Sequence, residues 1–180
     1  MQRAIGSRVG AAFLALAIAA PARAEDLAAA RAFTTALYAA YQHGEPDYLG
    51  KLAERTFDIS LLQRIRRDQE NTPDGEVGTL DGDPICDCQD AEGLKLIKLE
   101  LVGAGVGRAQ ARVTLRLADE TRPLALDLVA TTVGWRVGDV HTEGTPSLAG
   151  RLDAELAARQ APPKKVESSR STASGASSGR

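Results

Sequence analysis

Residues 108–117 alternate between apolar and polar side chains without interruption, and no other segment constrains the fold as strongly. The apolar set is Ala109, Ala111, Val113, Leu115 and Leu117, and the polar set is Arg108, Gln110, Arg112, Thr114 and Arg116. A period of two places these sets on opposite faces of a β-strand. One dry face and one wet face are typical of an antiparallel sheet that packs on a core from one side. The sequence therefore predicts such a sheet.

The neighbouring segments share this period and are separated by turn residues. Further strands are predicted at 94–101, 124–130 and 135–141, with Gly134 opening the last. The inward residues of the first two are expected to be Ile97, Leu99, Leu101, Leu124, Leu126, Leu128 and Ala130. The glycine-rich run 103–107 and the polar residues 119–121 supply the turns. The order predicts a curved meander of consecutive antiparallel strands.

Helical spacing appears on both sides of the strands. Residues 25–43 and 56–70 carry apolar side chains three and four apart, and Gly44 is a natural helix end. The expected stripes are Leu27, Ala30, Phe33, Leu37, Tyr38 and Tyr41, then Ile59, Leu61, Leu62 and Ile65. Ser147 is the expected N-cap of a short final helix with Leu148, Leu152 and Leu156 on one face. Helices followed by consecutive strands predict the α+β class.

The two ends of the chain differ in composition from the middle. Residues 1–24 join Arg3 and Arg8 to a short apolar run and a small-residue site at Ala22-Arg23-Ala24, which predicts a cleavable secretion signal. Residues 160–180 have six serines and two prolines, so a disordered tail is expected. Residues 25–159 are predicted to form a single domain, periplasmic or secreted after cleavage near Ala24, without a membrane anchor.

Charge argues against a nucleic-acid partner. Residues 25–159 contain 15 basic and 23 acidic side chains, which gives a net charge of −8. A surface of this sign repels phosphate backbones. The expected partner is instead an unknown small molecule or a periplasmic protein.

Four short motifs, taken in order, resemble one bacterial exported family. They are Leu37-Tyr38-x-x-Tyr41, Asp83-Pro84 with Gln89-Asp90, Gly134-Trp135-Arg136-Val137-Gly138-Asp139-Val140, and Ser147-Leu148-x-x-x-Leu152. Together they resemble the family described as domain of unknown function 3828, which is similar to a branch of the nuclear transport factor 2-like superfamily. The resemblance spans about residues 28–157. It implies a cone in which N-terminal helices pack on a curved antiparallel sheet, and it implies no catalytic residues.

Residues 81–90, here called the acidic segment, are the densest polar cluster in the chain. Asp81, Asp83, Asp87 and Glu92 stand at positions 1, 3, 7 and 12 of a calcium loop. That loop needs an oxygen ligand and a glycine where Ile85 and Cys86 stand, so no metal is predicted. In a structural interpretation, Asp83 caps a turn at Pro84 while Gln89 and Asp90 bond to backbone at a helix–sheet junction. In a third interpretation, these side chains face a ligand.

Cys86 and Cys88, the only cysteines, form a C-x-C motif that departs from the family pattern. Two lone cysteines in an oxidising compartment usually pair. Free thiols are one alternative. A redox site, or a soft-metal site completed by His43 or His141, is the other. No cofactor is predicted.

His141 follows the last predicted strand, two residues after Asp139. A histidine paired with Asp139 or Asp90 in a cone pocket would suit acid–base chemistry, whereas a histidine at a strand end is otherwise a surface residue. Tyr38, Tyr41 and Trp135 belong either to the core or to the lining of a pocket.

Three functional hypotheses follow. The leading one is an exported, non-enzymatic module that binds its ligand through Tyr38, Tyr41, Asp83, Gln89, Asp90, Trp135 and His141. The second is an enzyme that uses an Asp/His pair in a cone pocket. The third is a redox or metal-binding protein built on Cys86 and Cys88.

Overall fold

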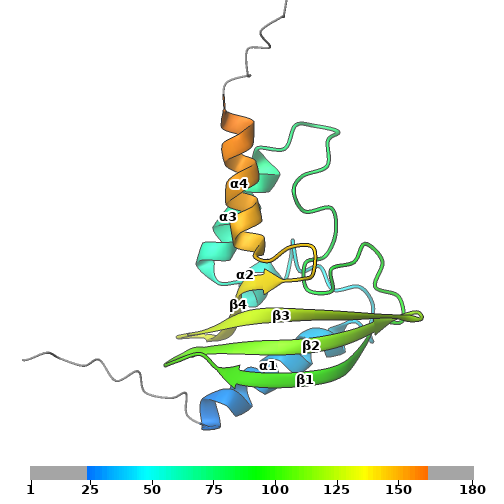
Figure 1. Cartoon of the computed structure of the whole chain (residues 1–180), viewed down its shortest axis with the longest axis vertical. Helices are drawn as coiled ribbons and strands as arrows, with labels where there is room; N and C mark the ends of the chain where they lie inside the picture. Colours follow the sequence, from blue (N-terminus) through cyan, green and yellow to red (C-terminus); the bar gives the residue numbers. More distant parts are fainter. Residues whose placement is uncertain (1–23, 162–180) are drawn as a thin grey trace, which may run out of the picture.

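The computed structural model describes residues 24–161, in which helices flank four consecutive strands. The elements are α1 (Ala24–Ala40), α2 (Ala53–Thr56), α3 (Ile59–Glu70), β1 (Lys95–Gly103), β2 (Arg108–Leu117), β3 (Glu120–Thr131), β4 (Gly134–His141) and α4 (Leu148–Gln160) (Figure 1). The α+β class is therefore confirmed. The predicted secretion signal and tail lie outside the described residues, apart from their innermost positions.

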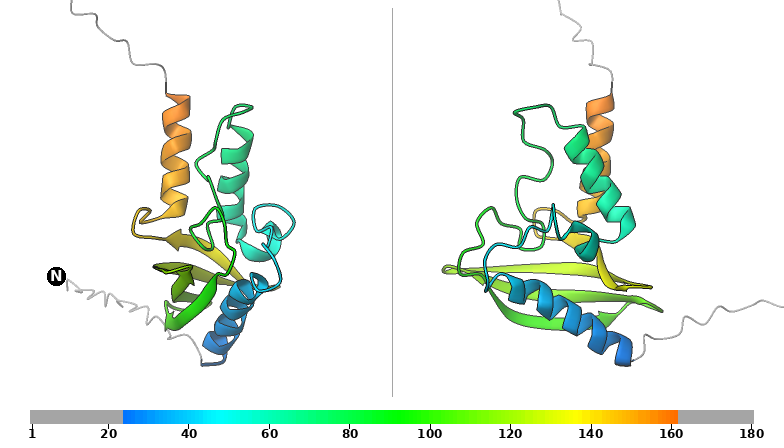
Figure 2. Two further views of the ribbon diagram at one scale, coloured as in Figure 1. Left: turned by 90° about the vertical axis from the view of Figure 1, so that its right-hand side faces the viewer. Right: turned by 180° about the vertical axis from the view of Figure 1, so that it is seen from behind.

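The strands form one antiparallel sheet in the order β1-β2-β3-β4, as a meander requires. Helix α1 crosses the face that carries the buried side chains, while α3 and α4 lie side by side beyond β4 (Figures 1 and 2). The predicted alternation of β2 is confirmed, because Ala109, Ala111, Val113 and Leu115 are all buried. Leu124, Leu126 and Leu128 of β3 are buried opposite them.

Two irregularities break the alternation in the outer strands. In β1 the register shifts between Leu96 and Lys98, so the unpaired Ile97 is 50% exposed and Leu96 packs on the core in its place. The prediction that Ile97 points inward was wrong, because Ile97 is the extra residue of a bulge and lies outside the alternation. In β4 a similar shift at Gly138 leaves both Val137 and Val140 buried.

The helix predicted at 56–70 is divided in two. Phe57 is extended and forms a bridge with Val137, and Asp58 then caps α3 by accepting a hydrogen bond from the Leu61 amide at 2.8 Å. The predicted position of Ile59 was wrong, since it begins α3 and is 67% exposed. Helix α1 ends at Ala40, three residues earlier than predicted, although Tyr41 remains buried.

Hydrogen bonds from side chains and loops reach both edge strands of the sheet or their ends. At β1, Arg31 donates to the Leu99 carbonyl at 3.2 Å and Gln42 to the Leu94 carbonyl at 2.7 Å. At β4, the Asp58 amide donates to the Val137 carbonyl at 2.9 Å.

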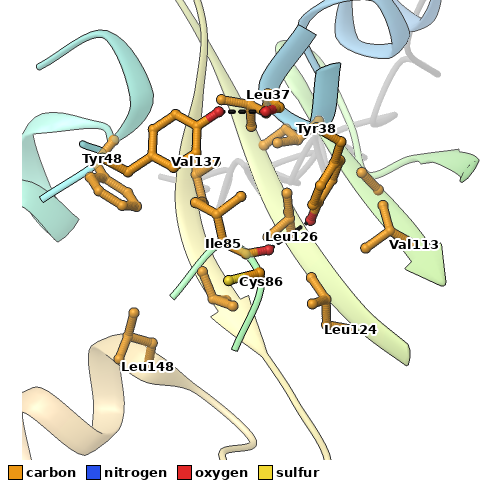
Figure 3. Packing of buried hydrophobic residues seen from close by; sticks show 14 of the residues in the cluster. Leu37, Tyr38, Tyr48, Ile85, Cys86, Val113, Leu124, Leu126, Val137 and Leu148 are labelled. Atoms are coloured by element: carbon orange, nitrogen blue, oxygen red, sulfur yellow. Dashed lines mark hydrogen bonds between the residues drawn. The ribbon is translucent and has the colours of Figure 1, made fainter. Parts of the chain in front are cut away.

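The core lies between the buried face of the sheet, α1 and the acidic segment. Figure 3 shows Ile85 and Cys86 between Tyr38 and Tyr48 on the helical side and Leu126 of the sheet. Trp135 is 7% exposed and belongs to the same cluster. Among residues 24–161, none of the helices combines the length and the hydrophobicity needed to cross a membrane.

Candidate functional site

A cavity of about 530 Å³ opens between the acidic segment, the β2–β3 turn, the end of β4 and the start of α4. The acidic segment contributes Asp81, Asp83, Pro84, Asp87, Cys88, Gln89 and Asp90. The opposite wall contains Leu117, Arg122, Val140, Thr142, Thr145, Leu148 and Arg151. Four carboxylates and two guanidinium groups therefore border a hollow of mixed polar and apolar lining.

Local hydrogen bonds set the shape of the acidic segment. Asp83 caps the turn, because its carboxylate accepts from the Ile85 amide at 2.8 Å. The backbones of Asp83 and Cys88 pair in an antiparallel bridge. A Cβ on Gly82 would lie 2.5 Å from the Cys88 carbonyl oxygen, so this approach requires glycine. Asp87, at the tip, has a φ of 53°.

Tyr38 and Tyr41, at the end of α1, attach the acidic segment to this helix, and Tyr48 attaches the loop after the helix to it. Tyr41 donates to the Asp83 carboxylate at 2.5 Å, and Tyr38 donates to the Ile85 carbonyl at 2.9 Å. Tyr48 donates to the Leu37 carbonyl at 2.5 Å (Figure 3). Tyr38 and Tyr41 are therefore buried anchors that support the cavity wall from behind rather than line it.

Burial controls the electrostatics of this cluster. Burial raises the pKa of the Asp83 carboxyl, although the hydrogen bonds from Tyr41 and the Ile85 amide act in the opposite direction. Burial, followed by the nearby negative charge of Asp83, raises the pKa of Tyr38, Tyr41 and Tyr48. All three tyrosines therefore remain hydroxyl donors at neutral pH.

Gln89 and Asp90 lie at the exposed rim of the cavity. Asp90 accepts a hydrogen bond from the Glu92 amide at 2.8 Å, a backbone contact of the kind expected. Asp90 is exposed, however, whereas the structural interpretation places it at a helix–sheet junction. The structure brings Asp83, Gln89 and Asp90 together at one cavity and places Tyr38, Tyr41 and Trp135 in the core.

Cys86 and Cys88 form a disulfide across Asp87, the first of the three alternatives. Cys86 is fully buried, whereas Cys88 borders the cavity. Within residues 24–161, no three His, Cys, Asp or Glu side chains converge on a point that could hold a metal ion.

His141 lies outside the cavity, on the outer face of the sheet. Its Nε2 lies 2.9 Å from Asp127 of β3, and its Nδ1 lies 2.5 Å from the Pro146 carbonyl oxygen. The predicted pairing with Asp139 or Asp90 was wrong. Asp139 instead accepts from the Ser147 hydroxyl at 2.6 Å and the Ala149 amide at 2.9 Å, which fixes the start of α4.

Two groups that sequence reasoning missed also shape the cavity. Arg122 donates to the Asp87 carbonyl at 2.6 Å and to the Glu120 carboxylate at 2.9 Å, so it links β3 to the acidic segment. Asp68 of α3 accepts from the amide and the hydroxyl of Thr79, at 2.9 and 2.5 Å, and this positions a second part of the wall. Asp68 follows Leu61 and Ile65 at helical spacing, so its place on the buried face could have been read from the sequence.

These features define an α+β protein with a large open cavity at the end of its sheet, and comparisons with known proteins add a distant relative. No protein-family model matches the chain. A protein of Escherichia coli (strain K12), described as "Uncharacterized protein YqhG", is 30% identical over 108 residues. The match covers 56% of this chain and 35% of that protein, so the chain spans about a third of the relative's length.

One solved structure is similar at low identity. It is a phospholipid-binding protein from Ralstonia solanacearum in complex with a phospholipid, with a TM-score of 0.44 and 14% identity. The similarity covers 74% of this chain and 86% of that one. A TM-score of this size does not establish a common fold.

Proposed function

We propose that residues 25–159 are a single exported, non-enzymatic binding domain, and that a small molecule occupies the cavity beside the acidic segment. The cavity volume of about 530 Å³ is the observation that carries this proposal. Ligand pockets typically measure about 300–1,000 Å³ and combine an apolar lining with a few convergent polar groups. Leu117, Val140 and Leu148 supply such a lining, and Asp81, Asp90 and Arg151 are polar groups at its border.

The proposed fold is a nuclear transport factor 2-like cone. The four-stranded antiparallel meander, with α1 across its buried face and α4 after the last strand, supports that proposal. In this arrangement the cavity lies where the acidic segment and α4 meet one end of the sheet.

The proposal omits catalysis because of how the titratable groups are placed. Within the cavity, Asp83 is engaged by Tyr41 and Ile85, and Asp90 is engaged by Glu92. The only close His–Asp pair in the described part of the chain lies on the outer face of the sheet, and both ring nitrogens of His141 face oxygen acceptors. A general base needs a free position from which it can take a proton.

The test is saturable binding of a neutral apolar dye, N-phenyl-1-naphthylamine, to the full chain purified from a bacterial periplasm. Leu117→Trp places a larger side chain in the cavity and is expected to weaken dye binding at least about tenfold, equivalent to about 1.4 kcal/mol. Val106→Trp is the matched control, because Val106 is 76% exposed and does not border the cavity.

Native mass spectrometry of the same preparation shows whether a small molecule is retained. The proposal expects such a molecule in the wild-type and Val106→Trp proteins and its loss from Leu117→Trp. Dye binding that does not saturate, or that is equal in the two variants, would count against the cavity as a ligand site. Co-purification of a periplasmic protein without a small molecule would favour a protein partner instead.

A further inference from the structure

The connection between β4 and α4, residues 142–146, is held at its far end by the histidine that precedes it. His141 Nδ1 lies 2.5 Å from the Pro146 carbonyl oxygen, while Nε2 lies 2.9 Å from the Asp127 carboxylate. Inside the connection, the Thr142 amide donates to the Thr145 carbonyl at 2.9 Å, and the reverse bond measures 3.3 Å. The imidazole therefore joins the connection to β3.

Both partners of the ring can only accept hydrogen bonds. A carbonyl oxygen and a carboxylate each need an N–H opposite them, and only the doubly protonated imidazolium has two. Neutral imidazole leaves one nitrogen lone pair facing an oxygen. The charged carboxylate of Asp127 is the stronger acceptor, so it retains the remaining proton. Deprotonation of His141 therefore breaks the hydrogen bond to Pro146.

The connection also forms one wall of the cavity. Thr142 and Thr145 border the cavity directly, and Leu148 and Arg151 follow at the start of α4. Arg151 lies 3.4 Å from the Thr145 hydroxyl, so α4 and the connection are linked on the cavity side. A change at Pro146 is thereby transmitted to groups that would touch a ligand.

We propose that the two hydrogen bonds of the His141 ring form a pH-sensitive contact that holds the cavity wall in place. With both ring nitrogens protonated the ring holds residues 142–146 against β3, and with one nitrogen deprotonated it releases Pro146 and loosens the wall. The release itself depends only on the contacts of His141. Its effect on a ligand rests on the proposed function.

The charged groups around the ring favour the imidazolium on balance. Asp127 of β3 and Asp139 of β4 are the nearby carboxylates, and Glu143 lies on the connection itself. Burial lowers the pKa of His141, but the hydrogen bond to Pro146 and the interactions with Asp127 and Asp139 outweigh this effect and raise it above 6.5.

Charged groups on the other elements near His141 include both signs, so some favour its protonation and others oppose it. A shallow pocket on the outer face of the sheet is bordered by His141 and by Lys98 and Glu100 of β1. Lys98 and Glu100 form an ion pair at 2.7 Å, so their charges offset each other. Arg112 of β2 also borders this pocket and opposes protonation, while Arg151 of α4 is turned toward Thr145. Because the pKa of His141 is raised in the folded protein, the hydrogen bond to Pro146 is fully formed below about pH 6.5. It is lost as the pH rises through the folded-state pKa of His141.

The experiment uses the fact that the chain has two histidines. In the His43→Gln protein, His141 is the only imidazole, and its NMR titration should give a pKa above 6.5. Hydrogen exchange of the Thr142 and Thr145 amides, corrected for the intrinsic rate at each pH, is measured on the same samples. Protection should fall by about tenfold as the pH passes through that pKa, the effect of losing one charged hydrogen bond.

Three variants decide the result. His141→Gln should show no pH-dependent step in protection, whereas His43→Gln should retain the wild-type step. Asp127→Asn keeps the shape of the acceptor without its charge, so the step should move to lower pH. A step that survives in His141→Gln, or protection that stays constant while His141 titrates, overturns the proposal.

These measurements need no ligand, so their outcome is separate from that of the proposed function. The apolar dye, titrated above and below the pKa of His141, then tests the coupling to the cavity. A pH-dependent affinity in His43→Gln that disappears in His141→Gln supports the coupling. Equal affinity at both pH values, with release observed by exchange, refutes it while leaving the cavity as a binding site.

Discussion

The largely buried carboxylate of Asp83 accepts a hydrogen bond from one tyrosine hydroxyl, that of Tyr41, the residue after α1. Tyr41→Phe removes that donor and leaves a buried charge with only the Ile85 amide. Losing a hydrogen bond to a charged group should lower the free energy of unfolding at neutral pH by about 1.5–3 kcal/mol. Urea unfolding monitored by the fluorescence of Trp135 measures this change.

The pH dependence of this variant distinguishes a charge effect from simple loss of packing. The pKa of Asp83 is raised in the folded protein, so its ionised form is the less favourable one, and protonation at low pH relieves it. The cost of Tyr41→Phe should therefore shrink as the pH falls through that pKa. Tyr48→Phe, which loses a bond to the neutral Leu37 carbonyl, should have a cost that does not vary over the same range. Parallel pH profiles for the two variants would contradict this account.

Because Asp90 is exposed, replacing it should have little effect on the free energy of unfolding. Its carboxylate accepts only from the Glu92 amide, at the rim of the cavity. Asp90→Ala should therefore change the free energy of unfolding by no more than about 0.5 kcal/mol, the usual range for surface substitutions. A melting curve beside that of the wild type measures it, and a loss above about 1 kcal/mol would show that the rim is structural.

The strands differ in how well their sequences predict them, and bulges are the reason. The β2 segment pairs without interruption along β3, from Arg108 opposite Val129 to Leu117 opposite Glu120, so a period of two predicts its buried face correctly. Ile97 follows the same pattern in the sequence but is half-exposed, because it is the unpaired residue of a bulge and Leu96 before it packs on the core instead. Local composition does not reveal a bulge that only the pairing with a neighbouring strand defines.

The bulge in β4 supplies a test at the scale of an element. A Cβ on Gly138 would lie 2.9 Å from the Val129 Cγ2 atom. Gly138→Ala should therefore lower the free energy of unfolding by about 1–3 kcal/mol through overpacking. Val129→Ala in the same chain should restore part of that loss. Gly144→Ala is the matched control, because nothing lies within 4 Å of a Cβ there. Equal effects at the two glycines would mean that the contact with Val129 does not set the cost.

Candidate site residues were predicted in part, for a physical reason. Asp83, Gln89 and Asp90 are close in sequence, so the density of polar residues was enough to place them at one cavity. The other wall comes from the β2–β3 turn, the end of β4 and the start of α4, and only the meander brings these segments to the acidic segment. The partner of His141 was missed for the same reason. Asp127 lies on the adjacent strand β3, and only the pairing of β3 with β4 brings it to His141.

At the scale of the whole molecule, α3 and α4 are joined by two ion pairs in different surroundings. Asp68 and Arg159 lie 3.1 Å apart, and the Asp68 side chain is 5% exposed. Arg64 and Asp153 lie 3.0 Å apart, and the Asp153 side chain is 51% exposed. The two arginine side chains are each 29% exposed, so the two pairs differ in whether the carboxylate is buried.

Asp68→Ala should be far more damaging than Asp153→Ala. Removing Asp68 leaves the buried amide and hydroxyl of Thr79 without their acceptor, and each unsatisfied buried group costs about 1–3 kcal/mol. Removing Asp153 breaks a solvent-exposed pair, which contributes at most about 1 kcal/mol. Urea unfolding of the two variants, and of Arg159→Ala with and without Asp68→Ala, measures both costs and the coupling between Asp68 and Arg159. A cost for Asp68→Ala no larger than that for Asp153→Ala would mean that packing of Leu148 and Leu152, and not this pair, holds α4 beside α3 and the cavity wall.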